Sequence, residues 1–471
     1  MRLIRFFSIW SAVSVFFVTT VSAQSLNDWS LNLIRSKKLN PDHFSFFWGE
    51  QPDQPLLNHQ ENQKMLPASI TKLLTASAVL EHFPPGSKFK TELRSSAKQE
   101  KSVLKGDLYL VGGGDPSFVS ENLWYLVNQF TRTGIKSIDG SIVVDDSLFD
   151  SVRYDDSRES VRVDRAYDAP VGAMSFNWNS VNVFVRPGDD SKAVVILDPE
   201  SEYFTLVNRV KTTGGSSAQI DVDRRWDPKS QKEIFTVTGR IGKNLKEHLV
   251  FANIQKPDLW SGANLKSFLL QRGITVTGGI QTGTASSSAK VLAESESKPI
   301  EHILSDMNKF SNNYVAEMLT KNMGLKKKSP GSISSGIQVI REHLKSLGIN
   351  DEQLNLVNPS GLTRENRMTA KSLWMVLSYH QNHFSTFPEY LSSLPIGGVD
   401  GTLKRRFKDD GMARKVRAKT GLLNGVTSLS GYAESQDKRM VPFVFMYNGP
   451  ADAGLARDVI DQIIKKAYSF K

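Results

Sequence analysis

PASITKLLTASAVLEHF, residues 67–83, carries the clearest helix signal in the first part of the chain. Leucines and small alanines recur in it at helical spacing, and Pro84-Pro85-Gly86 ends the pattern. Ser69 opens the apolar run after a proline, and Lys72 follows at i+3, so both side chains lie on one helix face. A serine hydroxyl is a weak nucleophile until a neighbour takes its proton. Ser69 is therefore a candidate nucleophile, and Lys72 is its candidate base.

Two further short motifs follow in order along the chain. Ser311-Asn312-Asn313 has the form Ser-x-Asn, and Lys419-Thr420-Gly421 occurs once, in a stretch that is typical of a strand. Other Ser-x-x-Lys matches fall in polar linker or loop sequence, so context favours Ser69 and Lys72. Those other matches are Ser95/Lys98, Ser287/Lys290 and Ser295/Lys298.

The chemistry of acyl transfer accounts for these residue types. A second cation such as Lys419 lowers the pKa of a buried lysine, which leaves Lys72 neutral enough to act as a base. Ser311 is suited to relay a proton to a leaving amine, and Asn313 to hold a substrate amide. Thr420 offers a hydroxyl to a terminal carboxylate, and Gly421 leaves a strand edge clear for an extended peptide. The backbone N–H groups of Ser69 and Leu422 are candidate oxyanion donors.

The pattern of expected helices and strands changes twice along the 471-residue chain. Residues 24–90 and 296–471 mix strands with amphipathic helices and are expected to form one α/β unit, an antiparallel sheet flanked by helices. Residues 91–295 consist mainly of short alternating runs separated by Gly, Pro, Asp and Ser, which predicts a β-rich insertion of one or two domains. The closing helix has an apolar stripe that is expected to pack on the sheet. Its alternative is a membrane-surface helix.

The N-terminus has the pattern of a secretory signal. Arg2 and Arg5 precede an uncharged apolar stretch that ends in Val21-Ser22-Ala23, so residues 1–23 are expected to be removed. The alternative is a permanent N-terminal anchor. The sequence has no cysteine, which excludes disulfides and a thiol nucleophile. Net charge falls from +10 to +8 without the two arginines, and export argues against a nucleic-acid partner.

Signals for metal and nucleotide chemistry are weak. The sequence contains no HExxH motif and no P-loop, so no metal and no cofactor is expected. His380 and His383 are spaced i, i+3 without an acidic residue between them, which favours a satisfied surface pair over a metal site. Gly112-Gly113-Gly114 lacks the Gly-Lys-Ser/Thr ending of a phosphate loop and predicts a tight turn.

The three motifs together form a trio found in β-lactamases and penicillin-binding proteins. The chain resembles specifically the DacB-type, class C low-molecular-mass penicillin-binding proteins, which are D-alanyl-D-alanine carboxypeptidases and endopeptidases. Ser69 and Ser311 are 242 residues apart, and this family carries a comparably long insertion of two β-rich domains between the first two motifs. The blocks that carry the resemblance include GDLYLVGGGDPSF (106–118), MNKFSNNYVAEML (307–319), NPSGLTRENRMT (358–369), LPIGGVDGTLKRRF (394–407) and AKTGLLNGVTSLSGY (418–432).

The resemblance implies a penicillin-recognising transpeptidase-like fold and a set of site residues. Ser69 would be the acylated nucleophile and Lys72 its general base, with Ser311, Asn313, Lys419 and Thr420 completing the site. The implied partners are peptidoglycan stem peptides ending in D-Ala-D-Ala and β-lactam antibiotics, met outside the cytoplasm in the periplasm or cell wall. No integral membrane segment is expected after signal cleavage.

A pocket for the stem-peptide side chain is also implied. Arg364 and Asn424 match positions that line it, and an acidic residue from Asp145-Asp146 is expected to join them. Two positions depart from the family pattern. Leu422 replaces a frequent hydroxyl residue, and Asn358 replaces a usual Asp in NPSGLTR.

Two other functions remain open. A β-lactamase needs a carboxylate to activate the deacylating water, and Asp351-Glu352-Gln353-Leu354-Asn355 resembles the relevant ExxLN loop except for Asp in the first position. A non-catalytic wall-binding protein on the same fold is the second alternative. Rapid turnover of penicillin would indicate the first function, and absence of any penicillin adduct would indicate the second.

Overall fold

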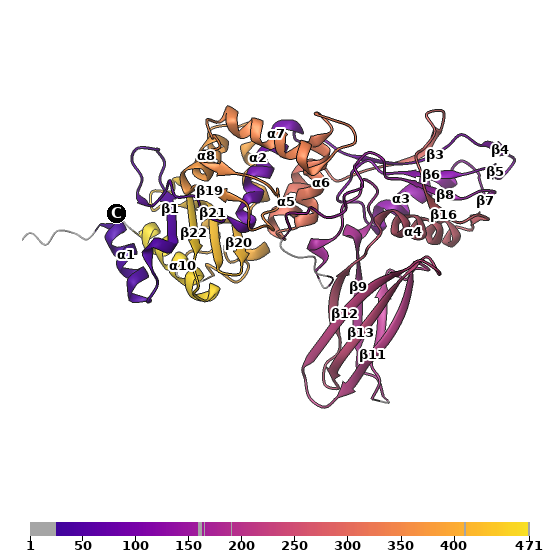
Figure 1. Cartoon of the computed structure of the whole chain (residues 1–471), viewed down its shortest axis with the longest axis horizontal. Helices are drawn as coiled ribbons and strands as arrows, with labels where there is room; N and C mark the ends of the chain where they lie inside the picture. Colours follow the sequence, from indigo (N-terminus) through magenta and orange to yellow (C-terminus); the bar gives the residue numbers. More distant parts are fainter. Residues whose placement is uncertain (1–24, 159–162, 164, 190, 409–410, 470–471) are drawn as a thin grey trace, which may run out of the picture.

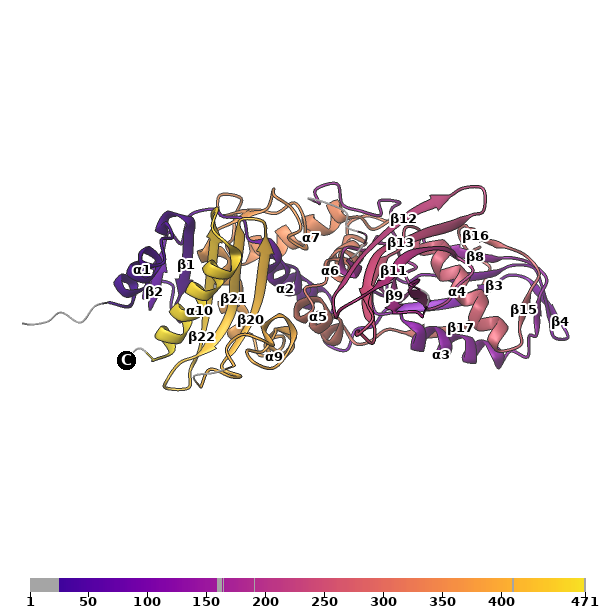
Figure 2. The same cartoon turned by 90° about the horizontal axis from the view of Figure 1, so that it is seen from below.

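The structure, a computed structural model, describes residues 25–158, 163, 165–189, 191–408 and 411–469. The expected signal peptide, residues 1–23, lies outside the described residues. The molecule is elongated, with a sheet and its helices at one end and the region of the expected insertion at the other (Figures 1 and 2).

The first end is built on a five-stranded antiparallel sheet that joins the two ends of the chain. Its strand order is β2-β1-β22-β21-β20, so β1 pairs with β22 although about 400 residues separate them, and β20 is the last strand at one edge. The strands are β1 (Phe44–Trp48), β2 (Leu57–His59), β20 (Val416–Leu423), β21 (Val426–Glu434) and β22 (Met440–Asn448). This sheet confirms the expected fold class.

Each face of the sheet packs on its own layer of helices. Along β22, Phe443 and Phe445 face α1 (Leu26–Ser36) and α10 (Ala453–Ser469), whereas Val444 and Met446 face the opposite, larger helical layer. This alternation follows from the two-residue period of a strand. The apolar stripe of α10 is buried against the sheet, as the sequence predicted, and is formed by Val459, Ile460, Ile463, Ile464 and Ala467.

Helix α2 (Lys72–His82) is the centre of the larger helical layer. It contacts five other helices, and every residue from Lys72 to Leu80 is buried. In Figure 1 it lies as an indigo helix among the orange ones that come much later in the chain. Its neighbours are α5 (Ile300–Lys309), α6 (Asn313–Gly324), α7 (Ile333–Ser346), α8 (Ala370–Gln381) and α9 (Phe387–Ser393).

Within this layer His380 is a core residue, which corrects the expectation of a surface pair. Its side chain is 1% exposed, and its Nε2 lies 2.8 Å from the hydroxyl of Ser77, which also contacts His343. His383 is exposed. The i, i+3 spacing did not reveal that one of the two histidines faces α2.

The region between the first two motifs forms two strand-rich parts that share one hydrophobic cluster. Strands β3 (Lys90–Ser95) and β17 (Lys290–Glu296) pair antiparallel, so the chain enters and leaves the region at neighbouring points. The first part contains β4 (Lys98–Glu100), β5 (Val103–Lys105), β6 (Leu108–Val111), β7 (Ser137–Ile138), β8 (Ile142–Asp145), β15 (Thr275–Val276) and β16 (Ile280–Thr282). The second contains β9 (Ser180–Arg186), β10 (Val194–Asp198), β11 (Phe204–Thr213), β12 (Ala218–Asp227), β13 (Lys232–Gly242) and β14 (His248–Asn253).

Two helices in this region, α3 (Ser120–Thr131) and α4 (Pro257–Gln271), pack beside the strands. Helix α4 was not anticipated from the sequence. Residues Trp260 to Leu265 of α4 are buried without a gap, so this stretch shows no single apolar stripe of the kind that marks a surface helix. Among the described residues, no helix combines the length and apolarity needed to cross a bilayer.

A loop between the short strands β18 (Leu354–Asn355) and β19 (Arg367–Met368) closes over the start of α2. Gly361 in this loop has φ +81°, and a Cβ added to it would lie 2.0 Å from the carbonyl oxygen of Ala68. The close approach sets the loop against the residue that precedes Ser69. Gly348 has a similar φ of +80°, but its added Cβ would meet only the flexible end of Met375, at 3.7 Å.

This pair of glycines allows a matched test of the close approach. Gly348→Ala should lower the free energy of unfolding by about 1 kcal/mol, because only the left-handed backbone is strained. Gly361→Ala should cost a further ~2 kcal/mol from overpacking. Chemical denaturation of both variants measures the difference, and equal losses would show that the loop does not press on Ala68.

Candidate active site

A cavity of about 760 Å³ lies where the edge strand β20, the start of α2 and the inserted region meet. The motif residues that line it are Ser69, Ser311, Asn313, Thr420, Gly421 and Leu422. Residues from outside the motifs complete the wall, and they include Arg165, Tyr167, Phe310, Leu362, Thr402, Arg406, Leu423, Asn424 and Arg457.

Ser69 and Lys72 are positioned by one turn of chain. Ser69 lies in the 3₁₀ turn Ala68–Thr71, directly before α2, and Ala68 adopts a left-handed φ of +52°. Lys72 Nζ donates to Ser69 Oγ at 3.2 Å, to Asn313 Oδ1 at 2.6 Å and to the carbonyl oxygen of Ser360 at 2.6 Å. The three acceptors match the three N–H donors of the protonated ammonium, and in the neutral amine the lone pair can face the one partner that carries a proton, the hydroxyl of Ser69. The geometry therefore directs Lys72 at the hydroxyl of Ser69.

The amine of Lys72 is shifted toward its neutral form. Burial lowers its pKa to about 7, because the charged form loses its hydration. The negative charges of Glu317 and Asp168 oppose this shift, and the positive charge of Arg158 adds to it. A lysine with a pKa near neutrality is able to accept a proton from a hydroxyl at physiological pH.

Lys419 was expected to be the cation that lowers the pKa of Lys72, but the cation that lowers it is Arg158, and Lys419 lies beside Ser311. Its Nζ donates to Ser311 Oγ at 2.8 Å and to the carbonyl oxygen of Thr420 at 2.8 Å. Burial lowers the pKa of Lys419 well below its ordinary value, and the neighbouring charge of Lys72 lowers it further. Ser311 adopts a left-handed φ of +56° and directly precedes Asn312, the N-cap residue of α6. The three motifs are thus brought together in one cluster.

The edge of β20 is open to a peptide. Lys415 O accepts from β21, whereas Val416 O and Ala418 N bond to residues 397 and 395 on the other side. The alternation of an antiparallel strand then points the N–H groups of Thr420 and Leu422 away from the sheet, at the cavity. Gly421 is required here, because an added Cβ would lie 2.1 Å from Ser428 Oγ and 2.7 Å from the carbonyl of Pro67.

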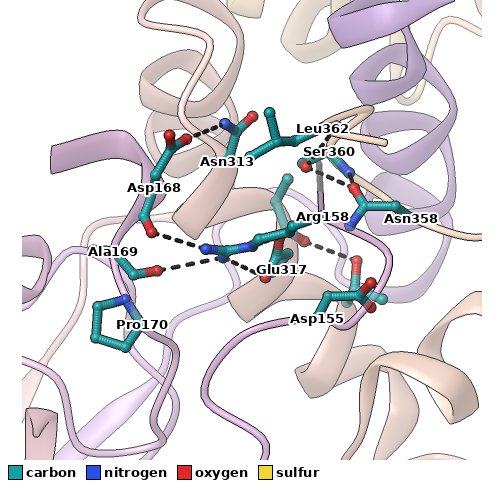
Figure 3. A network of polar contacts seen from close by, with 12 residues as sticks. Asp155, Arg158, Asp168, Ala169, Pro170, Asn313, Glu317, Asn358, Ser360 and Leu362 are labelled. Atoms are coloured by element: carbon teal, nitrogen blue, oxygen red, sulfur yellow. Dashed lines mark hydrogen bonds and ion pairs between the residues drawn. The ribbon is translucent and has the colours of Figure 1, made fainter. Parts of the chain in front are cut away.

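The inserted region contributes Asp168 and Arg158 to the surroundings of the site, and the sequence did not reveal these two residues. Asp168, in the short 3₁₀ turn Ala166–Asp168, accepts a hydrogen bond from Asn313 Nδ2 at 2.8 Å. Arg158 forms a buried ion pair with Glu317 of α6, and Figure 3 shows this network beside Asn313. Single polar residues in a strand-rich segment carry no periodic signal that would have identified them.

Residues expected to form the side-chain pocket are only partly brought together. Arg364 is exposed and is not among the lining residues, but it donates to the carbonyl oxygen of Asn424 at 2.8 Å, and Asn424 lines the cavity. Asp145 and Asp146 are not among the lining residues, which corrects the expectation for both. Asp145 accepts from the backbone of Ser147 and Ala285, and Asp146 pairs with Arg153. Both carboxylates brace the insertion.

Asn358, the departure within NPSGLTR, has a structural role. Its Oδ1 accepts from the backbone N–H groups of Ser360 and Gly361 and from the hydroxyl of Ser360. These bonds hold the loop that presents the Ser360 carbonyl to Lys72 (Figure 3). Asn358 therefore supports the base through the backbone. In the part of the chain that the structure describes, no three His, Asp or Glu residues cluster as metal ligands.

Comparisons with known proteins agree with this architecture. The chain is 30% identical over 412 residues to the D-alanyl-D-alanine carboxypeptidase of Actinomadura sp. strain R39, covering 84% of this chain and 76% of that protein. It is 27% identical over 406 residues to the D-alanyl-D-alanine carboxypeptidase DacB of Haemophilus influenzae, covering 84% and 83%. The crystal structure of penicillin binding protein 4 from the same organism has the same fold, with a TM-score of 0.78 and 24% identity over 93% of this chain and 98% of that one.

A family assignment follows from the extent of these matches. The profile of one family of serine peptidases matches residues 49–468, which spans the nucleophile turn, the insertion and the edge strand β20. The chain belongs to the D-Ala-D-Ala carboxypeptidase 3 (S13) family.

Proposed function

We propose that this serine hydrolase cleaves the D-alanyl-D-alanine ends of peptidoglycan stem peptides through an acyl-enzyme on Ser69. The observation that carries the proposal is the contact of the buried Lys72 amine with Ser69 Oγ, together with a Lys72 pKa of about 7. The names of the relatives from Actinomadura and Haemophilus support the same substrate class.

Acylation uses each group of the cluster. Ser69 Oγ attacks the carbonyl carbon of the penultimate D-alanine while Lys72 takes the hydroxyl proton. The N–H groups of Ser69 and Leu422 stabilise the oxyanion. The proton then passes through Ser311 to the leaving nitrogen, and the C–N bond breaks. Lys419 and Thr420 hold the terminal carboxylate of the departing D-alanine, and Asn313 holds the amide of the retained peptide.

Deacylation completes the reaction with water. A water molecule attacks the ester carbonyl and gives its proton to Lys72, which returns a proton to Ser69 Oγ as the ester bond breaks. Among the described residues that line the cavity there is no Asp or Glu, and Asp351 of the ExxLN-like stretch is not among them. A penicilloyl ester therefore lacks a carboxylate that would activate water against it, which favours a long-lived adduct over β-lactamase turnover.

The open edge of β20 suits a longer substrate as well. An extended peptide bound along Thr420 and Leu422 can carry either a free D-alanine or a cross-linked stem as its leaving group. We therefore include endopeptidase cleavage of D-amino-acid cross-links in the proposal. A protein with this substrate works outside the cytoplasm, in agreement with the signal pattern of residues 1–23.

Labelling and product analysis test the proposal together. Fluorescent penicillin should form a long-lived adduct that peptide mapping places within residues 66–72, and the purified protein should release D-alanine from pentapeptides without added metal. Mass spectrometry of digested peptidoglycan then reports pentapeptide and cross-link levels. Ser69→Ala is the control for labelling. Equal labelling of this variant would exclude Ser69 as the nucleophile, and unchanged wall peptides would exclude both peptidase activities.

Arg364 tests the proposed side-chain pocket. A guanidinium at this position pairs with a free carboxylate of a diaminopimelate side chain, so Arg364→Ala should slow turnover of diaminopimelate peptides by roughly ten- to a hundredfold. Acylation by a simple penicillin should be largely unchanged, because that ligand lacks the side chain. Both rates are measured on the same preparation.

Arg367→Ala is the matched control for the loop. Arg367 begins β19 at the end of the same loop and donates to the backbone carbonyls of Arg364 and Asn366, whereas Arg364 donates to Asn424, which lines the cavity. If Arg364→Ala reduced both reactions equally, or behaved like Arg367→Ala, the arginine would support the loop and the pocket role would be wrong.

A further inference from the structure

The side-chain amide of Asn313 lies between a hydrogen-bond donor, the amine of Lys72, and a hydrogen-bond acceptor, the carboxylate of Asp168. Its Oδ1 accepts from Lys72 Nζ at 2.6 Å, and its Nδ2 donates to Asp168 Oδ1 at 2.8 Å. Asn313 is 4% exposed and Asp168 is fully buried. A flipped amide would set N–H donors against the lysine and an oxygen against the carboxylate, and both contacts would be repulsive. The carboxylate therefore selects one of the two amide orientations.

Arg158 forms a second contact between the inserted region and helix α6, and it also holds the backbone at Asp168. Arg158 donates to both carboxylate oxygens of Glu317, at 2.9 and 2.6 Å, and to the backbone carbonyls of Asp168 and Ala169, at 2.8 and 3.3 Å. Asn313 and Glu317 are four residues apart on α6, so they share one face of the helix. The inserted region thus contacts α6 at two residues one turn apart, Asn313 and Glu317, as Figure 3 shows.

From this arrangement we infer that Asp168 is a positioning residue for catalysis, which holds the Asn313 amide with its oxygen toward Lys72 and thereby couples the inserted region to the catalytic base. The inference rests on the proposed function, since it assigns a role within that reaction. Asp168 does not line the cavity, so it acts through Asn313 and not on the substrate.

The charge of Asp168 gives this role a signature in the pH profile. Lys72 is surrounded by Glu317, Asp168 and Arg158, with Lys419 beside it, and the two carboxylates raise its pKa against the effect of burial. Removing the charge of Asp168 lowers the Lys72 pKa. Because Lys72 must be neutral to accept a proton, the acidic limb of the acylation rate then moves to lower pH.

Two substitutions separate orientation from charge. Asp168→Asn keeps an oxygen that can accept from Asn313 but loses the charge, so the acidic limb should shift to lower pH while the plateau rate stays within about threefold of wild type. Asp168→Ala loses both the acceptor oxygen and the charge. The acidic limb should therefore shift as in Asp168→Asn, and the plateau rate should fall roughly tenfold, the effect of losing one oriented hydrogen bond. The readout is the rate of labelling by fluorescent penicillin between pH 5 and about 9.

Asp150→Asn is the matched control. Asp150 also belongs to the inserted region and pairs with the buried Lys321 of α6, but it makes no contact with Asn313. Melting temperatures are measured for all three variants. Asp150→Asn should lower the melting temperature and leave both the plateau and the acidic limb of acylation unchanged.

The outcomes distinguish this inference from the proposed function. The positioning role is supported if the wild-type protein is labelled, the acidic limb shifts to lower pH in Asp168→Asn, and the plateau rate falls in Asp168→Ala. Wild-type labelling with an unshifted limb in folded Asp168→Asn overturns it, and that variant decides the matter even if Asp168→Ala fails to fold. An Asp150→Asn profile that matches Asp168→Asn would also overturn it, because a general loosening of the interface would then suffice. Absence of labelling in the wild-type protein would overturn the proposed function itself.

Discussion

Burial of one amine governs the chemistry that this cleft supports. Lys72 opens a helix that is surrounded by five others, so its amino group is wholly removed from water. An unpartnered amine in that position would cost several kcal/mol. The structure avoids this cost by giving it three oxygen acceptors, from Ser69, Asn313 and Ser360. The same burial lowers its pKa to about 7, which is the property that the proposed role of Lys72 as a base requires. Burial therefore both removes the Lys72 amine from water and lowers its pKa.

Charges around this amine set how far the shift goes. Glu317 and Asp168 favour its protonated form, whereas Arg158 disfavours it, and Lys72 in turn lowers the pKa of Lys419. Two of these groups, Arg158 and Asp168, come from the inserted region, although Ser69 and Lys72 lie on the other unit. The insertion is thus part of the electrostatic environment of the base and also part of the cavity wall, through Arg165 and Tyr167.

Sequence patterns predicted what local periodicity and short motifs encode. The helix after Ser69, the Lys-Thr-Gly strand and the buried stripe of α10 are all present, and the motif residues meet in one cluster. Features set by tertiary contact were missed. His380 is buried because its helix faces Ser77, α4 is buried around much of its circumference, and Asp168 acts through a partner 145 residues away. The family resemblance implied that an acidic residue from Asp145-Asp146 joins the pocket, but their carboxylates are used within the insertion.

The central claim is that the Lys72 amine titrates near neutrality in the folded protein. Nuclear magnetic resonance of protein with ¹³C-labelled lysine side chains measures this directly, with Lys72→Met used to assign the signal. The account predicts that one ε-carbon resonance, absent in the variant, titrates with a pKa of about 7. A Lys72 signal that titrates near the ordinary lysine value of about 10.4 would contradict it, because a protonated ammonium cannot take the proton of Ser69.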